Sequence, residues 1–150
     1  GGGQLTSMLS GCESVEVLGR LVEERGSSFN AIQVGVAFST LTKLVEKRGT
    51  GMGEDGGVVA RLLLDRMGET VGEFKHEHFC ETLVAVSKMD TVSPSPAVLQ
   101  AVLARALELS GALSHLDAEK VRGVLRGWDA ALGPTLEAAL WRRATTQPGG

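Results

Sequence analysis

The stretch FNAIQVGVAFSTLTKL, residues 29–44, decides the fold because it recurs twice further along the chain. Residues 74–89 read FKHEHFCETLVAVSKM, and residues 116–131 repeat the pattern more faintly as LDAEKVRGVLRGWDAA. The copies begin 45 and 42 residues apart, a period typical of two-helix solenoid repeats. The aligned apolar sets are Phe29, Phe74 and Leu116; Val34, Phe79 and Val121; Phe38, Leu83 and Leu125; Leu41, Val86 and Trp128; and Leu44, Met89 and Ala131. The repetition therefore predicts a stack of helix pairs.

Each copy begins like an α-helix. In the first copy we expect Asn30 as the N-cap, Gln33 as its capping-box partner, and Phe29 packed onto Val34 as a hydrophobic staple. We expect Asp117 to cap the helix of the third copy. The same spacing repeats the staple as Phe74 with Phe79 and as Leu116 with Val121.

Glycines, prolines and cap residues divide the rest of the chain. We expect repeats over about 14–49, 56–90 and 96–133, a terminal helix over 134–146 and a tail at 147–150. Residues 1–13, with three leading glycines, are expected to be flexible, or a fragment of a lost helix. Residues 49–57, GTGMGEDGG, are expected to form a flexible loop before a helix from Val58 to Met67, which Gly68 ends. The predicted fold is all-α, an α-solenoid of about three helix-pair repeats and about seven helices, with the helical-repeat domain at 14–146.

Composition narrows the class of protein. The 150 residues are 43% hydrophobic and 22% charged, as in an ordinary soluble domain. No apolar run approaches the roughly 18 residues that a membrane-spanning helix needs, so we expect no membrane insertion. Cys12 and Cys80 lack CxxC spacing, which favours a reducing compartment and two small core residues. The net charge of -3 has the wrong sign for a surface devoted entirely to phosphate binding.

Two motifs invite a chemical function and fail on their context. GMGEDG at residues 51–56 matches GxGxxG, but a helix precedes it, and two acidic residues would oppose a pyrophosphate. His76 and Cys80 share a face of the expected helix, while His78 points away from both, so the three do not converge on one metal ion. We therefore expect no enzyme, cofactor, metal site or small-molecule substrate.

The first copy, preceded by SVEVLGRLVEERG at residues 14–26, resembles octotricopeptide repeats, the helical-pair repeats of organelle RNA factors in algae and related protists. The resemblance covers roughly residues 12–132 and is carried by the apolar spacing, the Phe-Asn start, and the Thr-Lys-Leu and Ser-Lys-Met ends. It implies a role in RNA binding or in assembly of a ribonucleoprotein, such as an organellar ribosome, in a mitochondrion or plastid.

Polar residues recur at equivalent positions of the copies, as in a protein that reads one base per repeat. Asn30, Lys75 and Asp117 share one position, and Gln33, His78 and Lys120 share another. The alternative is that these residues serve only the helix starts. Basic residues on the second helix of each pair are candidates for phosphate contacts. The candidate RNA-binding residues are Asn30, Gln33, Lys43, Lys47, Arg48, Lys75, His78, Lys88, Lys120, Arg122 and Arg126.

Two functions therefore compete. The first is a non-enzymatic protein that binds RNA or is built into an organellar ribonucleoprotein. The second is a protein–protein scaffold, or an accessory subunit of a large organellar complex, which the acidic balance and the short array favour. A continuous basic groove would indicate RNA, whereas a neutral or acidic face with exposed apolar side chains would indicate protein. Trp141 either contacts a partner or packs on the third pair.

Overall fold

The computed structural model describes residues 2–89, 92–129 and 132–145, and these residues form helices joined by short turns. Eight α-helices and no strand occur in that part of the chain, which confirms the all-α prediction and exceeds the expected helix count by one. The helices are α1 (Gly2–Ser10), α2 (Val15–Arg25), α3 (Ala31–Arg48), α4 (Gly53–Thr70), α5 (His76–Ser87), α6 (Pro96–Leu109), α7 (His115–Trp128) and α8 (Pro134–Thr145). The tail at 147–150 and Ala131 of the third copy lie outside the described residues.

Helix α1 accounts for the extra element. Residues 2–10 are helical where the leading glycines indicated a flexible or fragmentary segment. Leu5 and Leu9 are buried, and α1 packs against α3. Two leucines four residues apart lie on one face of a helix, and their burial fixes this face on the core.

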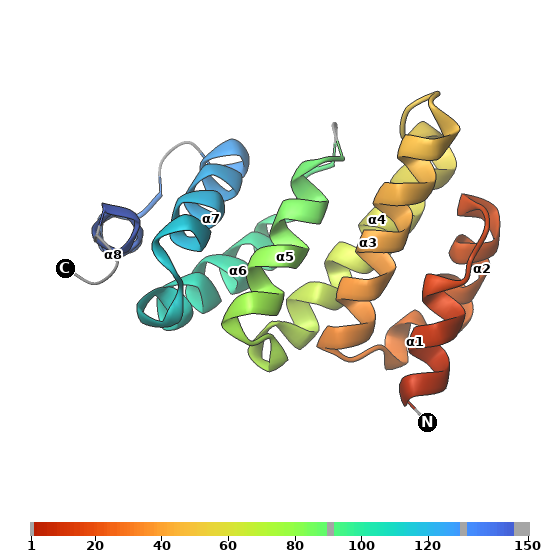
Figure 1. Cartoon of the computed structure of the whole chain (residues 1–150), viewed down its shortest axis with the longest axis horizontal. Coiled ribbons are helices and arrows are strands. Elements are labelled where there is room, and N and C mark those ends of the chain that lie inside the picture. The colour runs from red at the N-terminus through yellow and green to blue at the C-terminus, as the bar shows by residue number, and fades with distance from the viewer. Residues whose placement is uncertain (1, 90–91, 130–131, 146–150) are drawn as a thin grey trace.

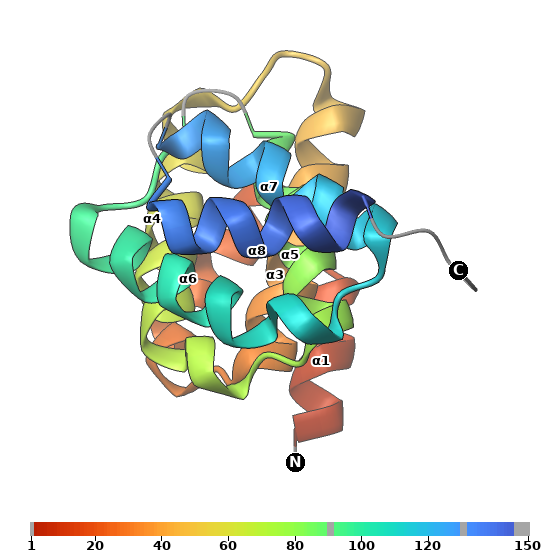
Figure 2. The ribbon, with the colours of Figure 1, turned by 90° about the vertical axis from the view of Figure 1, so that its left-hand side faces the viewer.

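The helices are arranged in two layers (Figure 1). Helices α1, α3, α5 and α7 pack one after another in the layer at the front of the view, and α2, α4 and α6 follow the same order behind them. Contacts between α3 and α4, among others, join the layers. Figure 2 looks along the stack and shows α8 lying across its end, where it packs on both α7 and α6.

One turn recurs three times between the layers. The 3-10 turns η1 (Gly26–Ser28), η2 (Val71–Glu73) and η3 (Ser110–Ala112) follow α2, α4 and α6. Each turn leads to a fully buried residue in an extended conformation, namely Phe29, Phe74 and Leu113. The next residue is the N-cap of the following helix, namely Asn30, Lys75 and Ser114. The turns are spaced 45 and 39 residues apart, from 29 to 74 and from 74 to 113.

An arginine from the next helix of the back layer holds each of these turns. Arg66 Nε donates to the carbonyl oxygen of Phe29 at 2.8 Å. Arg105 Nη2 donates to the carbonyl of Phe74 at 2.7 Å. Arg143 Nε of α8 donates in the same way to the carbonyl of Leu113. The same hydrogen bond therefore joins α4, α6 and α8 to the turns that precede α3, α5 and α7.

The register expected for the third copy is wrong by three residues. Ser114, not Asp117, is the N-cap, and its hydroxyl accepts from the Asp117 amide at 3.1 Å. Leu113 is fully buried before this cap, whereas Leu116 is 57% exposed and forms no staple. Three residues are nearly one helical turn, so buried residues such as Val121 fit the apolar stripe in either register. The two registers are distinguished by the cap at Ser114 and by the burial of Leu113 rather than Leu116.

The loop in the glycine-rich segment is shorter than expected, because α4 begins at Gly53 rather than at Val58. Arg48 closes the loop by donating to the carbonyls of Gly51 and Met52 and by pairing with Asp55 at 2.9 Å. Acidic side chains in the first turn of α4 suit the positive end of the helix. The hydrogen bonds from Arg48 and from the Gly56 amide hold the pKa of Asp55 below its usual value.

Gly68 does not end α4, which continues to Thr70. A Cβ atom at Gly68 would lie 3.0 Å from Val98 Cγ2 on α6. This glycine therefore serves the close approach of α4 and α6 rather than a helix terminus.

Candidate binding groove

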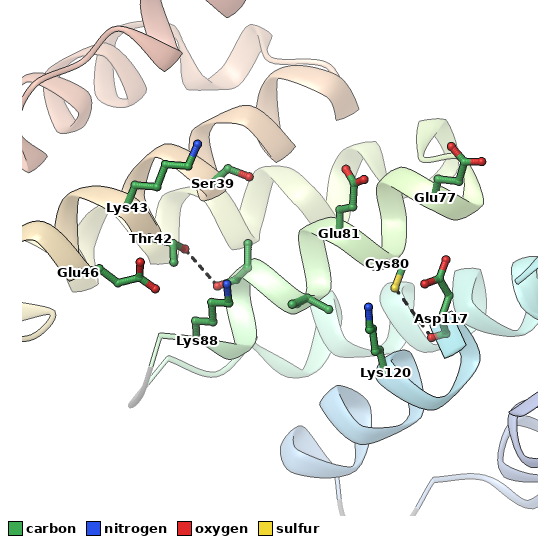
Figure 3. A pocket seen from close by; sticks show the side chains of 12 residues that line it. Ser39, Thr42, Lys43, Glu46, Glu77, Cys80, Glu81, Lys88, Asp117 and Lys120 are labelled. Carbon is green, nitrogen blue, oxygen red and sulfur yellow. Dashed lines mark hydrogen bonds between the residues drawn. The ribbon is translucent and has the colours of Figure 1, made fainter. Parts of the chain in front are cut away.

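A groove crosses the exposed face of the front layer, over α3, α5 and α7 (Figure 3). It encloses about 500 Å³. Its lining residues come from three successive helices of the same layer: Ser39, Thr42, Lys43 and Glu46 on α3; Glu77, Cys80, Glu81, Val84 and Ala85 on α5, with Lys88 at its end; and Asp117 and Lys120 on α7. We call this surface the α3/α5/α7 groove.

Short side chains form the floor of the groove. Thr42 Oγ1 donates to a backbone carbonyl, lying 2.9 Å from the Phe38 oxygen and 3.2 Å from the Ala85 oxygen. This contact draws α3 onto α5 and buries the hydroxyl. Ala85 and Cys80 continue the floor, and both are buried. The hollow exists because small residues lie where longer side chains would fill the space between the helices.

Charged side chains of both signs surround this floor. Four carboxylates line the groove, at Glu46, Glu77, Glu81 and Asp117, against three ammonium groups, at Lys43, Lys88 and Lys120. The balance is therefore slightly acidic. No ion pair within the described residues joins any of these lysines to a carboxylate at 4.0 Å or less. None of the three lysines is therefore neutralised by a direct ion pair in that part of the chain.

Cys80 contributes a neutral thiol. Its Sγ lies 3.9 Å from the backbone oxygen of Asp117, and burial, together with the negative charge of the Asp117 carboxylate, raises its pKa to about 11. A thiol that keeps its proton at neutral pH is a poor nucleophile and a poor metal ligand. Cys80 therefore acts as a small apolar residue, as its sequence position predicted, while Cys12 is only half-buried.

The groove brings together only three of the eleven candidate RNA-binding residues, Lys43, Lys88 and Lys120. Lys47 is exposed on another side of α3, beside Glu13 and Glu16. Lys75 and Arg126 are exposed outside the groove. These positions do not form one continuous basic strip along the helices.

Five other candidates have structural roles, of which three involve the start of α3. Asn30 Oδ1 accepts from the Gln33 amide at 2.9 Å, and Gln33 Oε1 accepts from the Asn30 amide at the same distance, which confirms the capping box. Gln33 is only 5% exposed. His78 Nε2 lies 2.8 Å from the Ala31 oxygen, and its ring stacks on Phe74. His78 is thus half-buried between α5 and α3.

The remaining two are arginines with partners in the fold. Arg48 closes the loop before α4, as described above. Arg122 pairs with Glu137 of α8 at 2.7 Å and lies 4.9 Å from the ring centre of Trp141. This cation–π contact joins α7 to α8, yet Trp141 is 55% exposed, so one side of its ring remains accessible.

The polar groove residues Glu77 and Glu81, and its small floor residues, were not predicted as site residues. A signal was present in the sequence, because small or charged residues recur at helical spacing opposite the apolar stripe of each second helix. Any solvated helix face has the same pattern, so the pattern does not identify a binding site until the positions of the helices relative to one another are known.

No group of three or more His, Cys, Asp or Glu side chains in the described part of the chain is placed to hold a metal ion. None of the described helices is long and apolar enough to cross a membrane. Comparison of the chain with protein-family models, with curated proteins and with solved structures gives no match.

Proposed function

We propose that the chain is a short α-solenoid that binds a polypeptide segment in the α3/α5/α7 groove and acts as a non-enzymatic scaffold. The observation that carries the proposal is the mixed charge of the groove, with four carboxylates and three lysines around a floor of small residues. A polypeptide supplies side chains of both signs and apolar groups, and so matches such a lining.

The repeated turn supports the solenoid assignment. The same 3-10 turn, buried N′ residue and N-cap occur three times, each held by an arginine of the next pair. Solenoids present extended surfaces built from equivalent helices, and these surfaces are the usual binding sites of such proteins. The α3/α5/α7 groove lies on a surface of this kind.

RNA is the second candidate, and one specific observation favours it. Lys43, Lys88 and Lys120 come from three successive front-layer helices, so the groove offers one cation per repeat. An organellar RNA role rests on the resemblance to octotricopeptide repeats. Against it, Glu77, Glu81 and Asp117 would repel phosphates at close range, and three lysines would neutralise few of them.

Photo-crosslinking from the groove tests the proposal. A benzophenone side chain in place of Ser39 lines the groove, and the same group in place of Arg61, exposed on α4 in the other layer, is the control. The protein, expressed in its native cells, is irradiated, and the crosslinked molecules are identified by mass spectrometry and by nuclease treatment. We expect one polypeptide segment at position 39 and none at position 61. That segment, made synthetically, should bind the purified chain and lose affinity in Glu81→Lys. Crosslinks to RNA, or identical products at both positions, would contradict the proposal.

A further inference from the structure

We infer that the segment bound in the α3/α5/α7 groove carries segregated charge, with its basic end over Glu77 and Asp117 and its acidic end over Lys43 and Lys88. This inference rests on the proposed function, because it specifies the kind of polypeptide that the groove accepts. It comes from the order of the charges along the helices rather than from their total.

The acidic end of the groove lies at the N-terminal ends of two helices. Glu77 is in the first turn of α5, and Asp117 is in the first turn of α7. Figure 3 shows both at the same end of the groove, with Glu81 one turn further along α5. Lys120 is the single cation of this half, so three carboxylates outnumber it.

The basic end lies at the opposite ends of the helices. Lys88 follows the last residue of α5, and Figure 3 places Lys43 of α3 at this same end of the groove. Glu46 is the single carboxylate there, so two lysines outnumber it. A ligand lying along α5 therefore passes from a region of net negative charge to a region of net positive charge.

The distance between the two ends sets the size of the segment. Glu77 and Lys88 are eleven residues apart in the chain, which corresponds to about 16 Å along a helix. An extended peptide covers this length with about five residues. The floor between the ends is formed by Val84, Ala85 and Thr42, which favours small apolar side chains in the middle of the segment.

Two synthetic peptides of identical composition test the inference on the full chain. Both peptides contain two lysines, two alanines and two glutamates. In the segregated peptide the lysines come first, then the alanines, then the glutamates. In the alternating peptide the lysines and glutamates alternate. We expect the segregated peptide to bind about fivefold more tightly at low salt, as a few exposed ion pairs allow. A spin label at its lysine end should broaden the amide signals of Glu77 and Asp117 more than those of Lys43 and Lys88.

A matched pair of charge reversals separates the groove from the general surface field. Glu81→Lys should remove the preference for the segregated peptide, whereas Asp65→Lys, exposed on α4 in the other layer, should leave it unchanged.

The possible failures are distinguishable. Two results would overturn the charge order while leaving a groove that binds polypeptides. The first is that both peptides bind with equal affinity and shift signals in the groove. The second is that the spin label at the lysine end of the peptide broadens the signals of Lys43 and Lys88 more than those of Glu77 and Asp117. Absence of binding by both peptides would overturn the inference, and the crosslinking at position 39 would then decide the proposed function independently.

Discussion

Arg105 on α6 donates from Nη2 to the carbonyl oxygen of Phe74, 2.7 Å away, and so ties the back layer to the turn that starts α5. Phe74 is fully buried and extended, so its carbonyl lies at a position where the helix itself supplies no donor. Arg66 with Phe29 and Arg143 with Leu113 repeat the arrangement. These hydrogen bonds between successive helix pairs hold the groove helices in their order.

Arg105→Ala should lower the free energy of unfolding by about 1.5–3 kcal/mol, because it removes a hydrogen bond from a charged donor to a buried carbonyl. Urea denaturation monitored by circular dichroism measures the change. Arg61→Ala, on the exposed face of α4, is the control and should stay within about 0.5 kcal/mol of the parent. An Arg105→Ala effect as small as that of the control would show that the repeated hydrogen bond contributes nothing to the stack.

Gly35→Ala should destabilise the chain by about 1–3 kcal/mol through overpacking. A Cβ atom at Gly35 would lie 2.1 Å from His78 Cε1 and 2.9 Å from Thr82 Oγ1, so the ring of His78 must move and lose its contact with Ala31. In the His78→Ala background, the same change should cost much less, which a double-mutant cycle detects.

Gly57→Ala is the matched control for Gly35→Ala. Gly57 also lies within a helix, α4, but a Cβ atom there would meet no atom within 4 Å. The change should stabilise the chain by roughly 0.5–1 kcal/mol, because alanine has the better helix propensity. If Gly35→Ala and Gly57→Ala changed the free energy of unfolding in the same direction, the result would contradict the close packing of α3 on α5.

Ser114→Ala should cost about 1 kcal/mol, because its hydroxyl is the N-cap of α7. Asp117→Asn should cost less, about 0.3–1 kcal/mol, since this side chain contributes mainly its charge in the first turn. Thermal denaturation of the two variants at low salt compares them. The reverse order would support the register in which Asp117 is the cap.

The caps show how far the sequence determines the fold. Asn30 with Gln33 is a local pattern, and the structure confirms the helix start that it predicted. Ser95 before Pro96 is a local pattern of the same kind, and it starts α6 in the structure. The third copy was misaligned because an apolar stripe tolerates a shift of three residues, and Ser114 and Asp117 are both acceptable caps. Local pattern alone does not choose between them. The burial of Leu113 rather than Leu116, a tertiary effect, decides the register.

Contacts between distant residues were not predictable from spacing. His78 and Gly35 are 43 residues apart, and nothing near His78 indicates that it packs against a glycine of another helix. Arg122 was predicted as a candidate for phosphate contact, and nothing near it in the sequence indicates that it pairs with Glu137, which α8 brings onto α7. The groove likewise depends on three helices coming together. The sequence therefore identifies the lysines of the groove as candidate binding residues. It does not identify the four carboxylates that lie beside them and make the groove slightly acidic.

Stability should fall at alkaline pH partly because of Cys80. Burial first, and Asp117 second, raise the pKa of Cys80 from 9.0 to about 11, so the unfolded chain loses this proton at lower pH than the folded chain. The contribution of Cys80 to the free energy of unfolding is therefore fully present below pH 9.0 and is lost as pH rises toward 11. Urea unfolding across this range should show a smaller loss in Cys80→Ala than in the parent. If the free energy of unfolding fell equally with pH in both proteins, the pKa of the Cys80 thiol would not be raised in the folded chain.

The most direct measurement of the central claim is a chemical-shift titration of the isotopically labelled chain with the segregated peptide and, separately, with single-stranded RNA. The proposed function predicts that the peptide shifts amide signals along the groove, at Ser39, Glu81 and Asp117, and leaves α4 residues such as Arg61 unchanged. RNA should shift the groove signals weakly and only at low salt. Strong RNA binding at Lys43, Lys88 and Lys120, with no groove response to the peptide, would contradict the account.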